Sequence, residues 1–155
     1  MAFKSQPTVT RPANTTAYTA GDVVGGVITF DGLGNKSGHI LVTSCDLRIH
    51  VSAIPSGMTS FTLHLYDATP GSAYADNAAW DLPSGDRANY LGYIDLGAPA
   101  DKGSTLYAQV DQVEKHIRMP GDAGADIFGY LVTNGAFTPA GNSEVYVPSI
   151  SAIPL

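Results

Sequence analysis

The segment from Cys45 to Asp67 has the clearest alternation of apolar and polar side chains. Apolar residues occupy every second position in two runs, which are Cys45, Leu47, Ile49 and Val51, then Phe61, Leu63 and Leu65. A period of two places each set on one face of a sheet, so both runs are predicted to be strands. Pro55 and Gly57 between them favour a chain reversal, which makes the two strands expected neighbours. Their apolar faces need a cover, and we expect a second sheet to supply it.

Further runs predict strands along the chain, over 22–30, 39–51, 91–96, 126–133 and 144–153. Gly25 and Gly26 in the first of these indicate a bulge or a close backbone approach. A break is expected near Thr43 in the second. The run 126–133 is apolar on both faces, which is typical of a strand between two layers. Pro148 has no amide hydrogen, so the last strand is expected at a sheet edge or with a bulge.

Residues 105–119 fit two patterns. Leu106, Ala108 and Val110 alternate as in a strand, whereas Leu106, Val110, Val113 and Ile117 share one face of a helix. We prefer the strand because the other elements are β and Gly103 provides a hairpin-like entry. The helix remains the alternative.

The stretch from Ala68 to Tyr90 is the longest without strand periodicity. Residues 76–80 within it are predicted to form one helical turn capped by Asp76. A compact domain rarely keeps such a long irregular loop without a use for it. Its aromatic side chains Tyr74, Trp80 and Tyr90 either contact a sugar ring or a protein partner, or pack beneath the loop as a small secondary core.

Residues 1–20 are predicted to form an extended arm, because Pro7 and Pro12 oppose a helix and the many threonines favour extended backbone. Such an arm either lies along its own sheet or pairs with a neighbour. Residues 21–155 are then expected to form a single domain. About eight short strands joined by turns predict an all-β fold, specifically a two-sheet antiparallel β-sandwich of jelly-roll type.

Composition supports this fold and excludes several classes of function. The chain has 155 residues, of which 44% are hydrophobic and only 14% charged, and its net charge is −6. Because phosphate binding needs a basic surface, nucleic acid is not an expected partner. The N-terminal residues have no apolar core of a signal peptide, and no run approaches the roughly 20 apolar residues of a membrane helix. We therefore expect synthesis in the cytoplasm and no membrane partner.

Residues that could carry chemistry are few. Cys45 is the only cysteine and is in phase with buried positions, so it is interpreted as a small core residue. His50 and His64 are expected on neighbouring strands, and a metal site there would need Asp46 or Asp67 as a third ligand. Hydrogen-bonded or surface histidines are the preferred interpretation. The carboxylates of the 68–90 loop do not have EF-hand spacing. No nucleophile motif is present, so we expect no catalytic residue, no metal and no cofactor.

Three ordered segments of the chain resemble small virion structural proteins of tailed bacteriophages. They are VTRPANTTAYTAGDVVGG near the start, FTLHLYDATP with SAYADNAAWDLPSGDRANYLGYIDLG in the middle, and IFGYLVTNGAFTPAGNSEVYVPSISA near the end. Within that class the chain is most similar to jelly-roll capsid decoration, or cement, proteins. The resemblance implies a place on the capsid surface of the virion, with the major capsid protein and other copies of the chain, as a dimer or trimer, as partners. It implies no enzymatic residues.

The candidate partner interface combines the arm and the aromatic loop. Its residues are Phe3, Pro7, Val9, Tyr74, Trp80 and Tyr90. An extended arm can add a strand to the edge of a neighbour's sheet, and weak contacts repeated over a shell add by avidity. The alternative function is a carbohydrate- or receptor-binding module of a head or tail fibre, using the loop aromatics. A small glycan hydrolase is a third reading.

Overall fold

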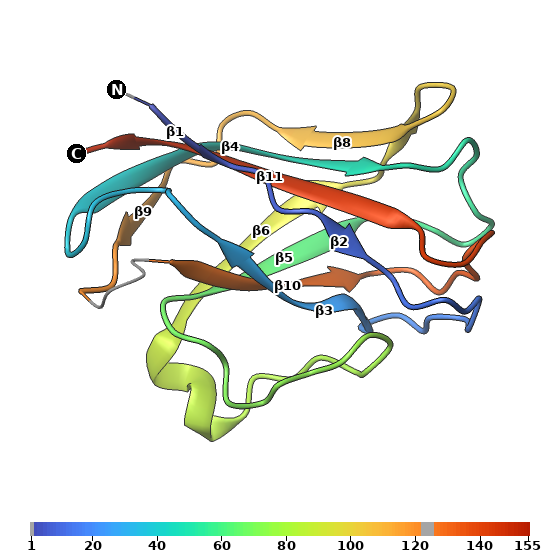
Figure 1. Cartoon of the computed structure of the whole chain (residues 1–155), viewed down its shortest axis with the longest axis horizontal. Coiled ribbons are helices and arrows are strands. Elements are labelled where there is room, and N and C mark those ends of the chain that lie inside the picture. The colour runs from blue at the N-terminus through green and yellow to red at the C-terminus, as the bar shows by residue number, and fades with distance from the viewer. Residues whose placement is uncertain (1, 122–125) are drawn as a thin grey trace.

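The computed structural model describes residues 2–121 and 126–155, and it confirms the predicted two-sheet antiparallel β-sandwich. Figure 1 shows the larger sheet above the smaller one, with an irregular loop below both. The helical content of the described residues is one short 3-10 helix, η1 (Ser84–Asn89). In the described part of the chain, no helix is long and apolar enough to span a membrane.

Within the described residues, the two sheets have seven and four strands. The larger sheet has the order β1 (Phe3–Ser5), β11 (Val145–Pro154), β4 (His39–Ile49), β8 (Leu106–Val110) and β7 (Ala100–Asp101), with β2 (Val9–Thr10) also on β11 and β9 (Lys115–Arg118) also on β4. The smaller sheet has the order β3 (Val23–Phe30), β10 (Ile127–Thr133), β5 (Phe61–Tyr66) and β6 (Tyr90–Gly97). The number of strands in the described residues is larger than the roughly eight expected, because β1, β2 and β7 are too short to show a periodic pattern in the sequence. Residues 105–119 form the two strands β8 and β9, so the strand prediction is confirmed.

The strands β4 and β5 lie in different sheets, so the prediction that they pair as neighbours is wrong. The connection 50–60 crosses from the larger to the smaller sheet instead of turning back within one sheet. Both strands still direct their alternating apolar residues to one core, because the sheets stack face to face. Large side chains of this core include Phe30, Phe61, Leu63, Leu47, Ile49 and Tyr146.

Two predicted irregularities are confirmed as β-bulges. The pairing of β3 with β10 skips Gly25 and Gly26, and both have φ between +80° and +90°. A Cβ on Gly25 would lie 2.1 Å from Val9 Cγ1, so glycine permits the close approach of β2. The pairing of β4 with β11 skips Thr43, where the partner strands β8 and β9 also separate.

Two prolines divide the outer strand of the larger sheet. The register that pairs Ser5 with Ile150 continues into β2, so Pro7 falls opposite Pro148. Neither proline has an amide hydrogen, and the hydrogen-bond ladder breaks there into β1 and β2. Because β1 and β2 pair with one side of β11 and β4 pairs with the other, β11 lies inside the sheet and not at its edge. The bulge in the ladder between β11 and β4 is at Thr43 of β4, away from Pro148.

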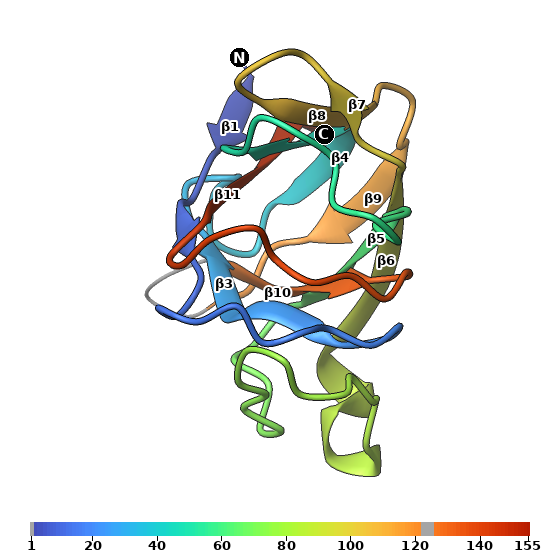
Figure 2. The same ribbon diagram turned by 90° about the vertical axis from the view of Figure 1, so that its right-hand side faces the viewer.

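The smaller sheet is covered on both faces. The larger sheet packs on one face, and the loop 67–89 lies against the other, as a separate layer in Figure 2. Every residue of β5 is buried for this reason, including the polar Thr62 and His64. Residues 76–80 form a turn and a bridge to Asp22, so the predicted helical turn is wrong. Asp76 instead bonds the amide of Gly25, which removes it from a capping role.

Candidate functional site

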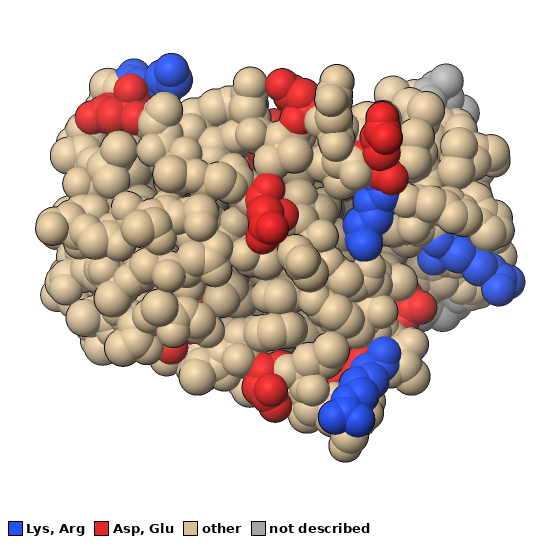
Figure 3. Space-filling model, turned by 180° about the vertical axis from the view of Figure 1, so that it is seen from behind, with Lys and Arg blue, Asp and Glu red and all other residues tan. Residues whose placement is uncertain are grey.

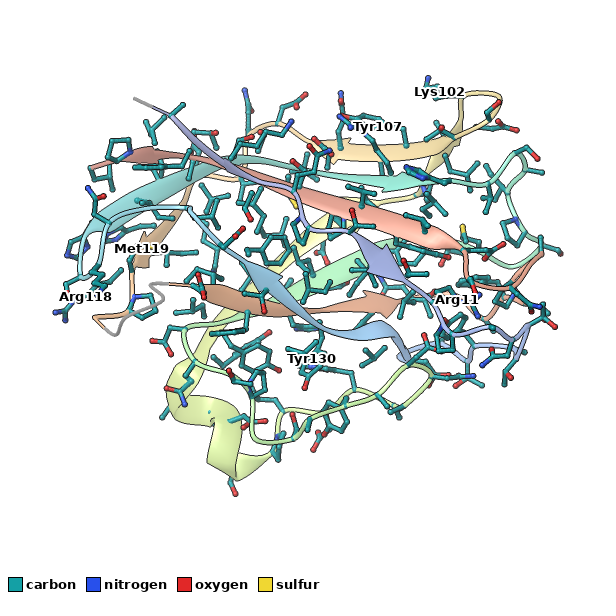
Figure 4. The ribbon with its side chains drawn as sticks, viewed as in Figure 1. Arg11, Lys102, Tyr107, Arg118, Met119 and Tyr130 are labelled. Atoms are coloured by element: carbon teal, nitrogen blue, oxygen red, sulfur yellow. The ribbon has the colours of Figure 1, made fainter. Side chains whose placement is uncertain are left out.

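The three loop aromatics of the candidate interface belong to the packing beneath the loop. Trp80 donates its indole N–H to Tyr66 OH at 3.0 Å and stacks on His64, with the ring centroids 3.6 Å apart. Tyr130 points from β10 toward the loop (Figure 4) and accepts a hydrogen bond from the Tyr74 amide at 3.0 Å. These side chains thus form the secondary core that the sequence offered as an alternative.

His64 lies at the centre of this aromatic layer. Its side chain is stacked on Trp80, and its Nδ1 is hydrogen-bonded to Tyr90 OH at 2.8 Å. Burial lowers the pKa of His64 from 6.5 to about 4, and the Asp95 carboxylate opposes the shift only partly. His50 is exposed beyond the end of β4, in the other sheet, so the proposed meeting of these two histidines does not occur.

The low pKa of His64 predicts a loss of stability in acid. Between pH 6.5, the pKa of His64 in the unfolded chain, and about pH 4, its pKa in the folded protein, the unfolded chain binds a proton that the folded protein does not. The contribution of His64 to the free energy of unfolding is therefore fully present above pH 6.5 and declines below it. This residue should account for about 2 kcal/mol of lost unfolding free energy between pH 7.5 and pH 5. Urea unfolding of His64→Gln at both values should show a pH dependence weaker by that amount. His50→Gln, which changes an exposed side chain, is the control and should retain the pH dependence of the parent protein. An equal pH dependence of the unfolding free energy in all three proteins would contradict the role given to His64.

The arm residues of the candidate interface face the interior of the sandwich. Phe3, Pro7 and Val9 share the inward side of the β1–β2 segment, where Val9 is only 8% exposed and the other two are half-buried. Val9 therefore belongs to the core. The exposed side chains of the segment are those of the even-numbered residues Lys4, Gln6, Thr8 and Thr10.

The backbone of this segment follows the same alternation. The Arg11 amide donates to the Glu144 carbonyl at 3.0 Å, in the same register as β1 and β2. Odd-numbered residues therefore turn their amides toward β11, and Lys4, Gln6 and Thr8 turn theirs outward. We name this row of outward amides, on Lys4, Gln6 and Thr8, the free edge of the larger sheet.

A buried ionic network behind the free edge was not predicted from the sequence. Arg11 is 1% exposed, and its Nη1 lies 3.6 Å from Glu144 Oε1. Its Nε donates to Tyr18 OH at 2.6 Å, and Tyr18 OH donates to Asp76 Oδ1 at 2.5 Å. Burial and the Asp76 hydrogen bond raise the pKa of the Tyr18 phenol well above its usual range. The network joins the arm, the loop and the start of β11.

Cys45, His39 and His116 are further reactive groups among the described residues. Cys45 is buried, and burial raises its pKa to about 12, so the thiol is not nucleophilic at neutral pH. His39 and His116 stack on adjacent strands with Nδ1 and Nε2 2.8 Å apart, in contact with solvent. Within residues 2–121 and 126–155, no three His, Cys, Asp or Glu side chains converge as metal ligands would.

A groove lies between β6 and the connection from β8 to β9. Its volume is about 430 Å³, and it is lined by Tyr93, Ile94, Asp95, Val110, Gln112, Val113, Glu114 and Lys115. Tyr93 is 57% exposed, which makes it the most exposed aromatic residue of the described chain. No local signal in the sequence predicted that residues 110–115, which were ambiguous between strand and helix, would lie beside Tyr93 and Asp95.

The surface is sparsely charged on the side opposite to that seen in Figure 1. Lys and Arg side chains are scattered there among Asp and Glu, without a continuous basic patch (Figure 3). This distribution agrees with the net charge of −6 and offers no track for a phosphate backbone.

Comparisons with known proteins give distant structural likenesses only. No family model matches the chain, and no curated protein matches it in sequence. Among solved structures, it is similar to a chain of the Israeli acute paralysis virus particle, with 11% identity and a TM-score of 0.34 over 100% of this chain and 73% of that one. A chain of the cyanophage Pam1 capsid asymmetric unit gives 14% identity and a TM-score of 0.33, covering 99% and 84%. A Clostridium thermocellum xylanase structure with a CBM22 module gives 5% identity and a TM-score of 0.31, covering 99% and 26%.

Proposed function

We propose that the chain is a structural protein of a tailed-phage virion, and specifically a capsid decoration protein that binds the outer capsid surface and stabilises the shell. The resemblance of its three sequence segments to phage virion proteins supports this assignment. A stiff scaffold supports it as well, because the sandwich has one continuous core and a second packed layer beneath the loop. Its partners would be the major capsid protein and other copies of the chain.

The free edge is the observation that carries the proposal. It presents outward amides from Lys4, Gln6 and Thr8 at the end of a seven-stranded sheet. An unpaired edge is a template for a strand from another chain, in which main-chain hydrogen bonds provide affinity. The arm itself stays paired with β11 through β1 and β2. A strand of the partner would pair with the outer edge of these two strands. Copies repeated over a shell would multiply a modest affinity.

Thr8→Pro tests this mode of binding. The substitution removes an outward amide, while the bonds between the segment and β11 come from the odd-numbered residues and remain. We expect unchanged thermal stability and an affinity for capsids lacking the protein that falls by about tenfold, since a hydrogen bond and the strand alignment are lost. Co-sedimentation with such capsids measures the affinity.

Thr8→Ser is the matched control, because it retains the amide hydrogen and should bind as the parent does. Normal decoration by Thr8→Pro would exclude the free edge as the contact. Failure of the parent protein to bind capsids of the phage that encodes it would overturn the decoration role itself. The alternative function, carbohydrate binding, is supported by a different part of the fold.

A further inference from the structure

We propose that the groove beside β6 is a binding site for a neutral oligosaccharide. The inference is independent of the decoration role, because the groove and the free edge have no residue in common. Sugar-binding sites need an aromatic face for the apolar C–H side of a pyranose ring and polar groups for its hydroxyls. The groove brings both together, and its volume of about 430 Å³ lies within the range of ligand sites.

Tyr93 supplies the aromatic face. The residue is 57% exposed although it stands on a paired strand and not in a loop. Behind it lies His64, with the ring centroids 6.0 Å apart, and His64 is itself held by Trp80. The aromatic layer beneath the loop thus supports an exposed ring at its margin, and little side-chain freedom remains to be lost on binding.

Four polar residues line the groove together with Tyr93. Asp95 accepts a hydrogen bond from Thr62 Oγ1 at 3.1 Å, which orients its carboxylate. Gln112, Glu114 and Lys115 line the opposite wall. Carboxylates accept hydrogen bonds from pairs of hydroxyl groups, an amide both donates and accepts, and an ammonium donates. Together these groups match sugar hydroxyls, which both donate and accept hydrogen bonds.

The backbone around these residues has features that position them. Gly92 has φ +95°, and a Cβ there would lie 2.8 Å from Lys115 Nζ, so the glycine leaves room for the ammonium group. Glu114 has φ +51°, a conformation that costs free energy for a residue with a Cβ. Strain of this kind is concentrated at functional sites.

The charges select among sugars. Asp95 and Glu114 against Lys115 leave the groove with one net negative charge. An anionic sugar such as a sialoside would meet repulsion, whereas a neutral hexose or N-acetylhexosamine would not. We therefore expect neutral glycans to bind and acidic ones to be rejected.

The test is a glycan microarray of neutral and sialylated oligosaccharides, followed by calorimetric titration of each neutral glycan bound. We expect Tyr93→Ala to weaken binding by at least about tenfold and Tyr93→Phe to retain it, because stacking needs the ring and not the hydroxyl. Glu114→Gly relieves the positive-φ strain, so it should fold at least as well as the parent and still lose affinity. Ala73→Gly, at another positive-φ position and outside the groove, should bind normally.

The outcomes separate this proposal from the proposed function. Absence of binding to any neutral glycan, binding confined to sialylated glycans, or full affinity in both Tyr93→Ala and Glu114→Gly would each overturn it. Tyr93→Ala should still decorate capsids, and Thr8→Pro should still bind glycans. Either site can therefore fail without the other.

Discussion

Arg11→Ala should lower the free energy of unfolding by about 3–5 kcal/mol, because it leaves Glu144 buried without its cation. Glu144 is 8% exposed, and one of its oxygens is already bonded to the Gly141 amide, so water cannot easily replace the guanidinium. The Tyr18 phenol loses its donor in the same step. Urea denaturation followed by circular dichroism measures the effect, and a loss below about 1 kcal/mol would contradict a network that depends on the ion pair.

A double substitution separates charge burial from packing. Arg11→Met with Glu144→Leu removes both charges and keeps apolar volume, and buried ion pairs replaced in this way are commonly no less stable. We expect the double variant to recover most of the stability lost in Arg11→Ala. A double variant as unstable as the single one would show that Arg11 stabilises the fold through its hydrogen bond to Tyr18, and through Tyr18 to Asp76, and not through the ion pair.

Trp80→Ala should cost about 3 kcal/mol and uncover the outer face of the smaller sheet. The substitution removes the ring stacked on His64 and the donor to Tyr66 OH, so the aromatic layer beneath the loop loses its only indole ring. Because Trp80 is the only tryptophan, unfolding must be followed by circular dichroism. Binding of the dye ANS should rise, since Tyr66 and Tyr130 become accessible.

Trp80→Phe provides the control for the loss of volume. It keeps an aromatic ring on His64 but not the hydrogen bond, so its loss should be roughly 1 kcal/mol, the usual contribution of one bond. If Trp80→Ala were as stable as the parent and failed only in binding a partner, Trp80 would be a contact residue of the candidate partner interface.

The fold class followed from local signals that tertiary structure did not override. Alternation in β4 and β5, the glycine pair in β3 and the two apolar faces of β10 each predicted what the structure has. The pairing of β4 with β5 was wrong because Pro55 and Gly57 indicate that the chain turns, but not whether the next strand stays in the sheet. The periodicity of a strand is the same in either sheet.

The sites were less predictable because they depend on contacts between distant segments. Trp80 was found as a notable residue, but only the fold shows that it packs on His64. Arg11 and Glu144 are separated by most of the chain, and neither belongs to a motif. The groove required β6 to meet residues 110–115 across the edge of the sandwich, for which the sequence has no local signal.

The pairing of Phe3 with Ala152 has a practical consequence for protein engineering. The first and last strands end at the same corner of the sandwich (Figure 1), so peptides fused to the two ends would emerge side by side. If the chain coats a particle, each copy would present two different fused peptides as a closely spaced pair. Neither the Tyr93 groove nor the aromatic layer would be altered.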